Sequence, residues 1–209
     1  MGVQVTRIGR FPIEKHEELF REYMLHLRLE TDDVVDLRYD ALMKISEAFD
    51  IAESYTNRII VPSIMEISMS ELSSETLLPV TPCSEIISVE YLNSEGQKKS
   101  MSPEDYSLVF DDWKIELYLF DVPLISKSVR PETVWIRLKA GYGITGLPEE
   151  WQRKITIPGT IKSAVKLIAG NLFSSDGDQT VGRWAGKLNM GHEKLLSHYR
   201  ISPYNTSVY

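Results

Sequence analysis

The strongest periodic signal in the chain lies at residues 41–58, ALMKISEAFDIAESYTNR. Its apolar residues recur at steps of four, three, four and three: Ala41, Ile45, Ala48, Ala52 and Tyr55. These steps place all five on one side of an α-helix, because about 3.6 residues complete each turn. The stretch therefore predicts an amphipathic helix that packs against other helices.

Helical spacing also flanks this stretch on both sides. Upstream, apolar residues at three- and four-residue steps predict a helix that begins near Pro12, and an acidic break at residues 30–33 predicts a helical hairpin. The upstream set is Leu19, Phe20, Tyr23, Met24 and Leu27. Downstream, the same steps return after Pro158, and a short final helix is expected from Leu195. The downstream set is Ile161, Val165, Ile168 and Leu172.

Residues 59–140 show a different pattern, in which β-branched residues alternate with polar ones between Pro- and Ser-rich turns. The expected strand faces are Met65, Ile67 and Met69 on one strand and Ile87, Val89 and Tyr91 on another. A turn is expected at residues 93–96, with Gly96 at positive φ. Further strands are expected at residues 106–110, 114–119 and 133–139.

Together these patterns predict an α+β fold, a helical bundle core with an inserted small antiparallel β unit. The predicted helical core covers residues 12–58 and 158–200, and the β-rich insertion covers residues 59–145. The polar and aromatic residues 201–209 are expected to form a flexible C-terminal tail. All of these parts are expected within a single domain over residues 1–209.

Composition excludes several classes of protein. The 209 residues include one cysteine, Cys83, so no internal disulfide and no Cys-based metal cage is expected. No apolar stretch approaches the roughly 18–20 residues of a membrane helix, so no membrane association is expected. The net charge of −7 argues against a free-standing nucleic-acid binder.

The charge is distributed unevenly along the chain. Residues 1–150 hold 15 Lys and Arg against 27 Asp and Glu, whereas residues 151–209 hold 8 against 3. The net charges are therefore −12 and +5. The cationic part is interpreted either as a solvated helix face or as a surface for an acidic protein or DNA.

Residues 141–146, GYGITG, match the GxGxxG pattern of dinucleotide-binding sites. That site needs a helix directly after the glycines and an acidic residue about 20 positions on. Leu147 and Pro148 follow instead, and residues 155–175 contain no Asp or Glu. A glycine-rich exit from a strand is the favoured reading, and a nucleotide-binding enzyme stays as the alternative. No catalytic residue and no cofactor are predicted. No metal site is predicted either, because His16, His26, His192 and His198 form no HExxH motif.

A candidate partner interface lies near the carboxyl end. Residues 174–191 show no periodicity and include Gly177, Gly182, Gly186 and Gly191. Arg, Trp and Tyr anchor many protein interfaces, since each buries a large area and still offers hydrogen bonds. We expect these segments to become ordered against a partner, although Trp184 could also close over the core. The candidate residues are Arg183, Trp184, Lys187, Tyr199, Arg200, Tyr204 and Tyr209.

Several short motifs occur in a characteristic order over roughly residues 22–175. They are LHLRL at 25–29, AESYTNR at 52–58, LPVTP at 78–82, ISVEY at 87–91, SPEDY at 102–106 and KAGYG at 139–143. In this order the chain resembles the head–tail connector proteins, or adaptors, of tailed bacteriophages.

The resemblance implies a non-enzymatic structural protein of the virion neck, made in the host cytoplasm. Such a protein binds the portal protein, joins neighbouring copies in a ring, usually of twelve, and receives a tail or stopper protein. It completes the DNA-filled head, and the genome passes through its lumen during ejection without specific binding. Another neck or tail-completion protein, a stopper or a tail terminator, is the alternative within this class.

Overall fold

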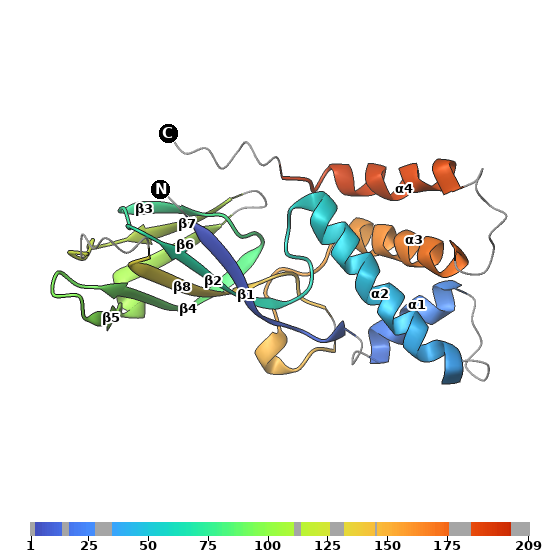
Figure 1. Cartoon of the computed structure of the whole chain (residues 1–209), viewed down its shortest axis with the longest axis horizontal. Helices are drawn as coiled ribbons and strands as arrows, with labels where there is room; N and C mark the ends of the chain where they lie inside the picture. Colours follow the sequence, from blue (N-terminus) through green and yellow to red (C-terminus); the bar gives the residue numbers. More distant parts are fainter. Residues whose placement is uncertain are drawn as a thin grey trace. The chain divides into compact units, whose positions relative to one another are not determined.

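The computed structural model describes residues 3–13, 17–27, 35–110, 114–125, 132–144, 146–175 and 185–201 (Figure 1). The chain forms two compact units, which we call the β unit and the helical unit. The β unit comprises Met1–Arg10, Val61–Gly143 and Trp151–Ile155, and the helical unit comprises Phe11–Ile60, Ile144–Glu150 and Thr156–Tyr209. The single domain over residues 1–209 and its internal boundaries stay predictions.

The helical unit contains four α-helices in its described part: α1 Glu17–Leu27, α2 Val35–Thr56, α3 Gly159–Ser175 and α4 Ala185–Ser197. Of the periodic residues predicted for the long central helix, Ala41, Ile45, Ala48 and Ala52 are buried on α2, which confirms that helix, whereas Tyr55 near its end is half-buried. Helix α3 packs against both α2 and α4. Tyr23 of α1 lies with its ring centroid 6.2 Å from that of Phe49 on α2. Lys166 of α3 donates to Glu22 of α1 at 2.6 Å.

The β unit contains two antiparallel sheets. The five-stranded sheet has the order β1-β2-β8-β4-β5, and the three-stranded sheet has the order β3-β7-β6. Alternate residues of β2 and β8 form its core, because Met65 and Ile67 lie opposite Leu138 and Ile136 and all four are buried. The bounds are β1 Gln4–Arg10, β2 Ser63–Met69, β3 Glu75–Leu78, β4 Cys83–Leu92, β5 Lys98–Ser100, β6 Tyr106–Phe110, β7 Ile115–Leu119 and β8 Val134–Ala140. Two short 3-10 helices, η2 Pro103–Asp105 and η3 Glu149–Trp151, lie between these elements.

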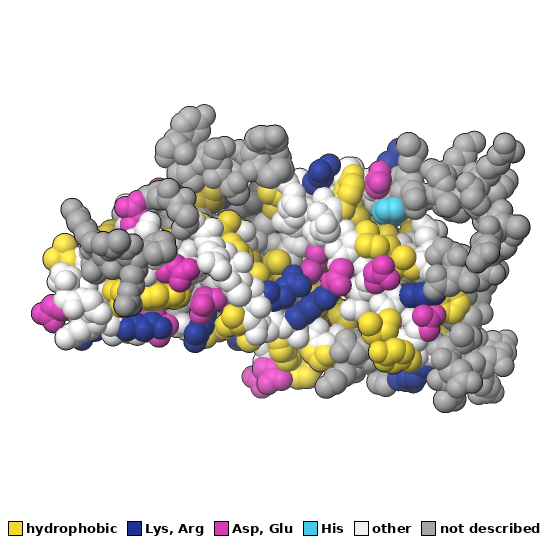
Figure 2. All heavy atoms as spheres, viewed as in Figure 1, with side chains coloured by type: hydrophobic (Ala, Val, Ile, Leu, Met, Phe, Trp, Pro, Cys, Tyr) yellow, Lys and Arg dark blue, Asp and Glu magenta, His cyan; other side chains and the backbone are white. Residues whose placement is uncertain are grey.

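The other face of the five-stranded sheet carries three cross-strand ion pairs. Arg137 pairs with Glu66 at 2.7 Å, Lys139 with Glu85 at 3.0 Å, and Lys98 with Glu90 at 2.8 Å. On the face shown in Figure 2, cationic and anionic side chains of the β unit lie close to one another. Because each charge has an opposite neighbour, these pairs add no net charge to this surface.

The buried guanidinium of Arg153 joins the ends of two strands. Its Nε donates to the backbone oxygen of Ala140 at 3.1 Å, and its Nη2 donates to that of Ser63 at 3.2 Å. Burial lowers the pKa of this guanidinium, but an arginine stays charged in proteins. The charged donor therefore satisfies backbone acceptors where β2 begins and β8 ends.

The predicted fold class, a helical bundle core with a small inserted β unit, is wrong. The described residues form eight strands in two sheets as well as four helices, and strand and helix contribute about equally. The polar start of the chain is not an approach to the first helix but strand β1, which pairs with β2 at the sheet edge. An edge strand buries little, so its sequence lacks the alternation that marks a half-buried strand.

Two local expectations also need correction. Ile87 is exposed rather than buried with Val89, since a β-bulge between Ile86 and Ser88 inserts one residue and shifts the faces. The final helix begins at Ala185, ten positions before Leu195, so part of the aperiodic segment 174–191 is helical. Gly191 of this helix lies against α3, where an added Cβ would be 3.9 Å from Leu167. A glycine at a helix contact lowers helix propensity but permits close packing.

Candidate partner-binding site at the carboxyl end of α4

The chain changes direction sharply after α2. Thr56, which is fully buried, donates from Oγ1 to the backbone oxygen of Ala52 at 2.7 Å and closes the last turn. Asn57 follows with φ of 54°, in the left-handed region. Asn is among the few residues that tolerate this conformation, and it commonly ends helices in this way.

The turn after α2 is held by a buried carboxylate. Glu53 Oε1 accepts a hydrogen bond from the backbone N–H of Ile60 at 2.7 Å, and the Glu53 side chain lies within the unit. Hydrogen bonds to ionised groups are stronger than neutral ones. Residues 57–60 are therefore tied back to the helix that they leave.

Three hydrogen bonds join this turn to the residues that follow α4. The N–H of Ile201 donates to the Thr56 oxygen at 2.9 Å, and Asn57 Nδ2 donates to the Ile201 oxygen at 2.9 Å. Arg58, which is almost fully buried, donates from Nε to the Tyr199 oxygen at 2.6 Å. Residues 56–58 thus bind residues 199–201, and we call this arrangement the tail anchor.

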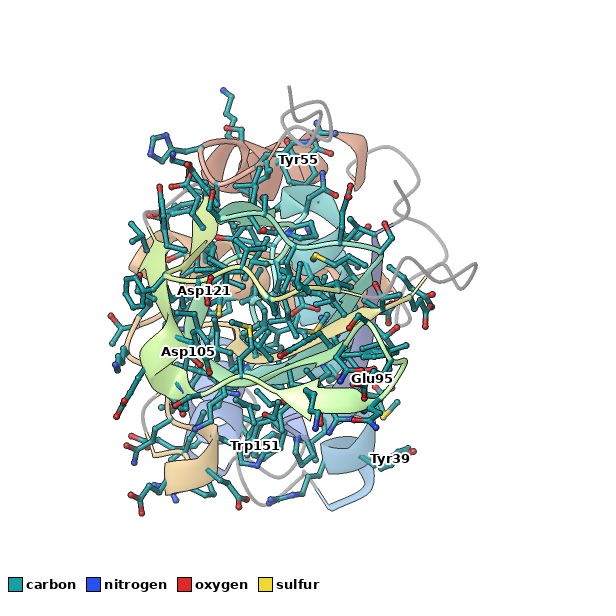
Figure 3. All side chains as sticks on the ribbon, turned by 90° about the vertical axis from the view of Figure 1, so that its left-hand side faces the viewer. Tyr39, Tyr55, Glu95, Asp105, Asp121 and Trp151 are labelled. Carbon is teal, nitrogen blue, oxygen red and sulfur yellow. The ribbon has the colours of Figure 1, made fainter. Side chains whose placement is uncertain are left out.

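Aromatic and cationic side chains surround the tail anchor. The Arg200 guanidinium lies 5.2 Å from the ring centroid of Tyr55, within the range of a cation–π interaction. The His198 and Tyr199 rings meet edge to face, with centroids 5.5 Å apart and an interplanar angle of 84°. Figure 3 shows Tyr55 beside the ribbon of α4. His198 and Arg200 are exposed, so this end of the helical unit presents aromatic and cationic groups to solvent, and groups of this kind are enriched at protein interfaces.

The structure places only some of the predicted interface residues. Tyr199 and Arg200 lie together at the tail anchor. Lys187 lies on α4, but its side chain is outside the described part. The remaining predicted residues, Arg183, Trp184, Tyr204 and Tyr209, also lie outside the described residues, so the interface as a whole stays a prediction.

Sequence reasoning missed the residues that hold the anchor. Tyr55, Asn57 and Arg58 lie some 140 positions before Tyr199 and Ile201, and no local pattern connects the two segments. One signal was present, since Asn directly after a long apolar helix indicates a left-handed helix end.

Close packing of the backbone explains two of the glycines within residues 141–146, Gly141 and Gly143. Gly141 has φ of 95°, and an added Cβ would lie 2.6 Å from the Val61 oxygen. At Gly143 an added Cβ would lie 2.7 Å from the Arg153 oxygen. Both positions need glycine because neighbouring backbone passes too close for a side chain. No α-helix begins until Gly159, so the described part of this segment does not form the strand-to-helix phosphate loop of a dinucleotide site.

Other chemical groups give no second site in the described part of the chain. No cluster of three or more His, Cys, Asp or Glu residues suited to a metal ion occurs among the residues that the structure describes. Cys83 is buried, and burial raises the pKa of its thiol to about 11. Among the described helices, none combines the length and the apolar character that a bilayer crossing requires.

Comparison with known proteins identifies the class of fold. No protein-family model matches the chain, and no curated protein matches it. Solved structures do match, and three of them are chains of virus-like particles, two from structures of the neck and one from a structure of the virion. The agreement extends over nearly the whole chain, so it includes both the β unit and the helical unit.

The individual structures are particles of a gene transfer agent (GTA). A chain of "Neck of empty GTA particle computed with C6 symmetry" is 17% identical, with a TM-score of 0.71 over 95% of this chain and 96% of that chain. A chain of "Virion of native gene transfer agent (GTA) particle" is 16% identical, with a TM-score of 0.70 and the same coverage. "Neck of native GTA particle computed with C12 symmetry" contains a third, 15% identical, with a TM-score of 0.66. At this identity the likeness shows a shared fold, which agrees with the expected class of structural neck protein.

Proposed function

We propose that the protein is a structural component of a virion neck, a head–tail adaptor that binds the portal as a ring of identical copies. The observation that carries this proposal is the shared fold with a GTA neck chain over 95% of this chain and 96% of that chain. Near-complete coverage of both chains means that the β unit and the helical unit both share the fold of that neck chain.

In this proposal the tail anchor positions the end of the described chain. Its three hydrogen bonds hold residues 199–201 at the end of α2, and the segment 202–209 follows Ile201 in sequence. This segment contains Tyr204 and Tyr209 and no charged residue. In the proposal this segment binds the portal or a neighbouring copy, because tyrosine side chains bury a large area at interfaces and still offer hydrogen bonds.

Ring formation is supported by symmetry in the related particles. Two of the matching neck structures were computed with sixfold and twelvefold symmetry. A ring needs a head-to-tail contact between two different patches of the subunit. In the proposal the DNA passes through the lumen without specific binding, and no step of chemistry is assigned to the chain.

The test is binding to the portal followed by electron microscopy of the complex. We expect the full chain to form a ring directly below the portal. A variant that ends at Ile201 keeps every hydrogen bond of the anchor and should bind the portal at least tenfold more weakly. Full binding by this variant would contradict the role of residues 202–209, but not the adaptor proposal. Absence of the full chain from the portal, with a ring farther along the neck, would instead indicate a stopper or tail terminator.

A further inference from the structure

The two edges of the five-stranded sheet differ in length and in side chains. The edge strand β5 has only three residues, Lys98–Ser100, and two of them are lysines. Short edge strands and lysine side chains are common means by which proteins prevent another strand from pairing with a sheet edge. The opposite edge strand, β1, has seven residues, and its Val5 and Ile8 are 40% and 50% exposed. The β5 edge is therefore well protected against pairing, and the β1 edge is much less so.

The outer side of β1 can accept a further strand. β1 pairs with β2 in regular antiparallel register over Gln4–Arg7, before a bulge between Arg7 and Gly9. Along such a strand, residues that exchange hydrogen bonds with one neighbour alternate with residues whose N–H and C=O point to the other side. No other strand in the described part of the chain pairs with β1. Within Gln4–Thr6, alternate residues therefore direct backbone donors and acceptors to the side where no described strand lies.

Residues 202–209, SPYNTSVY, have the sequence of a strand, and we call them the terminal segment. Tyr204, Thr206 and Val208 occupy alternate positions, and aromatic and β-branched residues favour strands. Pro203 lacks an N–H, and proline is accepted as the first residue of a strand. The terminal segment contains no Lys, Arg, Asp or Glu, whereas every other stretch of three or more residues outside the described ranges contains at least one. It is therefore the segment of this chain best suited to join a sheet edge.

The length of the terminal segment also suits the β1 edge. A strand rises about 3.3 Å per residue, so residues 204–209 suffice to span about 20 Å, and the seven residues of β1 span about 23 Å. The terminal segment follows Ile201, which the tail anchor binds to the end of α2. Pairing of the terminal segment therefore begins from a residue whose backbone is already held.

We propose that residues 204–209 of one copy pair as an added strand with the β1 edge of the neighbouring copy. This inference rests on the proposed function, and it assigns the terminal segment to a neighbouring copy rather than to the portal. Backbone hydrogen bonds form the contact, as in other cases of strand addition. Each copy gives one segment and receives one, and the two surfaces are different parts of the subunit, as a head-to-tail ring requires.

A proline scan of the terminal segment tests for strand pairing. Proline removes an N–H that a ladder needs, but it is accepted where that N–H points away from the partner strand. The four variants are Asn205→Pro, Thr206→Pro, Ser207→Pro and Val208→Pro. We expect two of them, at alternate positions, to raise the concentration needed for ring assembly on the portal at least tenfold, and the other two less than threefold. Mass photometry measures the assembly.

The two tolerated prolines are the matched controls for the two disruptive ones. All four substitutions follow the last described residue, Ile201, so circular dichroism should show the same folded chain in each. Losses that do not alternate along the segment, or no loss in any variant, would overturn the proposed pairing.

Disulfide trapping tests which edge receives the terminal segment. Cys83 is the only cysteine and is fully buried, so introduced cysteines can be followed without replacing it. Val5→Cys is combined in one chain with a cysteine at each position of residues 204–208 in turn. We expect at least one combination to form a ladder of covalent multimers under oxidising conditions. Lys99→Cys, on the protected β5 edge, is the control and should form no ladder with the same positions.

The products distinguish failure of this contact from failure of the adaptor proposal. A disulfide within one copy in place of the ladder, or an equal ladder with Lys99→Cys, would overturn the proposed pairing between copies. A normal ring on the portal without the ladder would contradict this contact and leave the adaptor proposal intact. A ladder from a chain that never binds the portal would support the contact and contradict the adaptor proposal.

Discussion

Arg58 donates from Nε to the backbone oxygen of Tyr199 at 2.6 Å, across 141 positions of sequence. The bond connects the turn after α2 with the residue that follows the last turn of α4. It thereby joins the best-predicted helix of the chain to the origin of residues 202–209. The Arg58 side chain is almost fully buried, so the tail anchor is part of the interior of the helical unit.

Replacement of Arg58 should therefore destabilise the protein. Arg58→Ala leaves the part-buried backbone oxygen of Tyr199 without this donor and empties the buried position of the arginine, and we expect the free energy of unfolding to fall by about 1–3 kcal/mol. Arg200→Ala is the control, since an exposed cation–π contact contributes only about 0.5–1 kcal/mol. Urea unfolding followed by Trp fluorescence measures both. Equal losses in the free energy of unfolding would mean that the Arg58–Tyr199 hydrogen bond contributes no more to stability than the exposed cation–π contact does.

Asn57 allows a test of the backbone conformation at the same turn. Its φ of 54° is unfavourable for residues with a Cβ, by about 1–2 kcal/mol in general, and Gly has no such cost. Both Asn57→Ala and Asn57→Gly remove the bond to the Ile201 oxygen. Asn57→Ala should thus lower the unfolding midpoint more than Asn57→Gly does. The reverse order would show that helix propensity outweighs the left-handed turn.

Gly141 should not tolerate a side chain. In Gly141→Ala the new Cβ would lie 2.6 Å from the Val61 oxygen at a φ of 95°, and backbone strain of this kind costs about 1–3 kcal/mol. Gly159→Ala is the matched control, because nothing lies within 4 Å of a Cβ at that position. Thermal unfolding should separate the two variants clearly. Saturable dinucleotide binding abolished by Gly141→Ala would instead revive a nucleotide site.

The Cys83 thiol should be unreactive in the native protein. Burial raises its pKa to about 11, so roughly one molecule in a thousand carries the thiolate at pH 8 even before access is considered. A colorimetric thiol reagent should find no reactive group in the native chain and one in the chain unfolded in guanidinium chloride. Rapid native labelling would show that the β unit opens locally.

The Glu22–Lys166 ion pair predicts that the protein becomes less stable as the pH falls into the acid range. The hydrogen bond from Lys166 holds the pKa of Glu22 below its ordinary value. A carboxyl whose pKa is lower in the folded state contributes stability above its unfolded pKa, near 4.5, and loses it as pH falls through the folded value. The pair is partly exposed, so the effect should be small. Unfolding midpoints of Glu22→Gln should therefore vary less than those of the unaltered chain from about pH 5 to pH 3. Glu18→Gln, an exposed neighbour on α1, should leave the dependence unchanged.

Much of the candidate site could not be found from sequence, and the reason is the distance between its parts. Tyr199 and Arg200 could be selected by residue type, because aromatic and cationic residues near a chain end suit an interface. Arg58 could not, since its partner lies 141 positions away and a single arginine after a helix has many possible roles. Glu53 likewise reads as a polar residue on an amphipathic helix, although its carboxylate is buried and bonded to Ile60.

The sequence by itself determined the elements whose burial repeats at a regular step. Ala41, Ile45, Ala48 and Ala52 repeat every three or four residues because one side of α2 faces the core, and Met65, Ile67 and Met69 alternate because one side of β2 does. Gly96 indicated its turn because positive φ favours glycine. Tertiary structure alone decided that residues 4–10 add an edge strand to the sheet and that the bulge turns Ile87 outward. It also decided that Arg58 donates a hydrogen bond to Tyr199, which follows α4. These features depend on pairing between distant segments, and such pairing leaves no period in either segment.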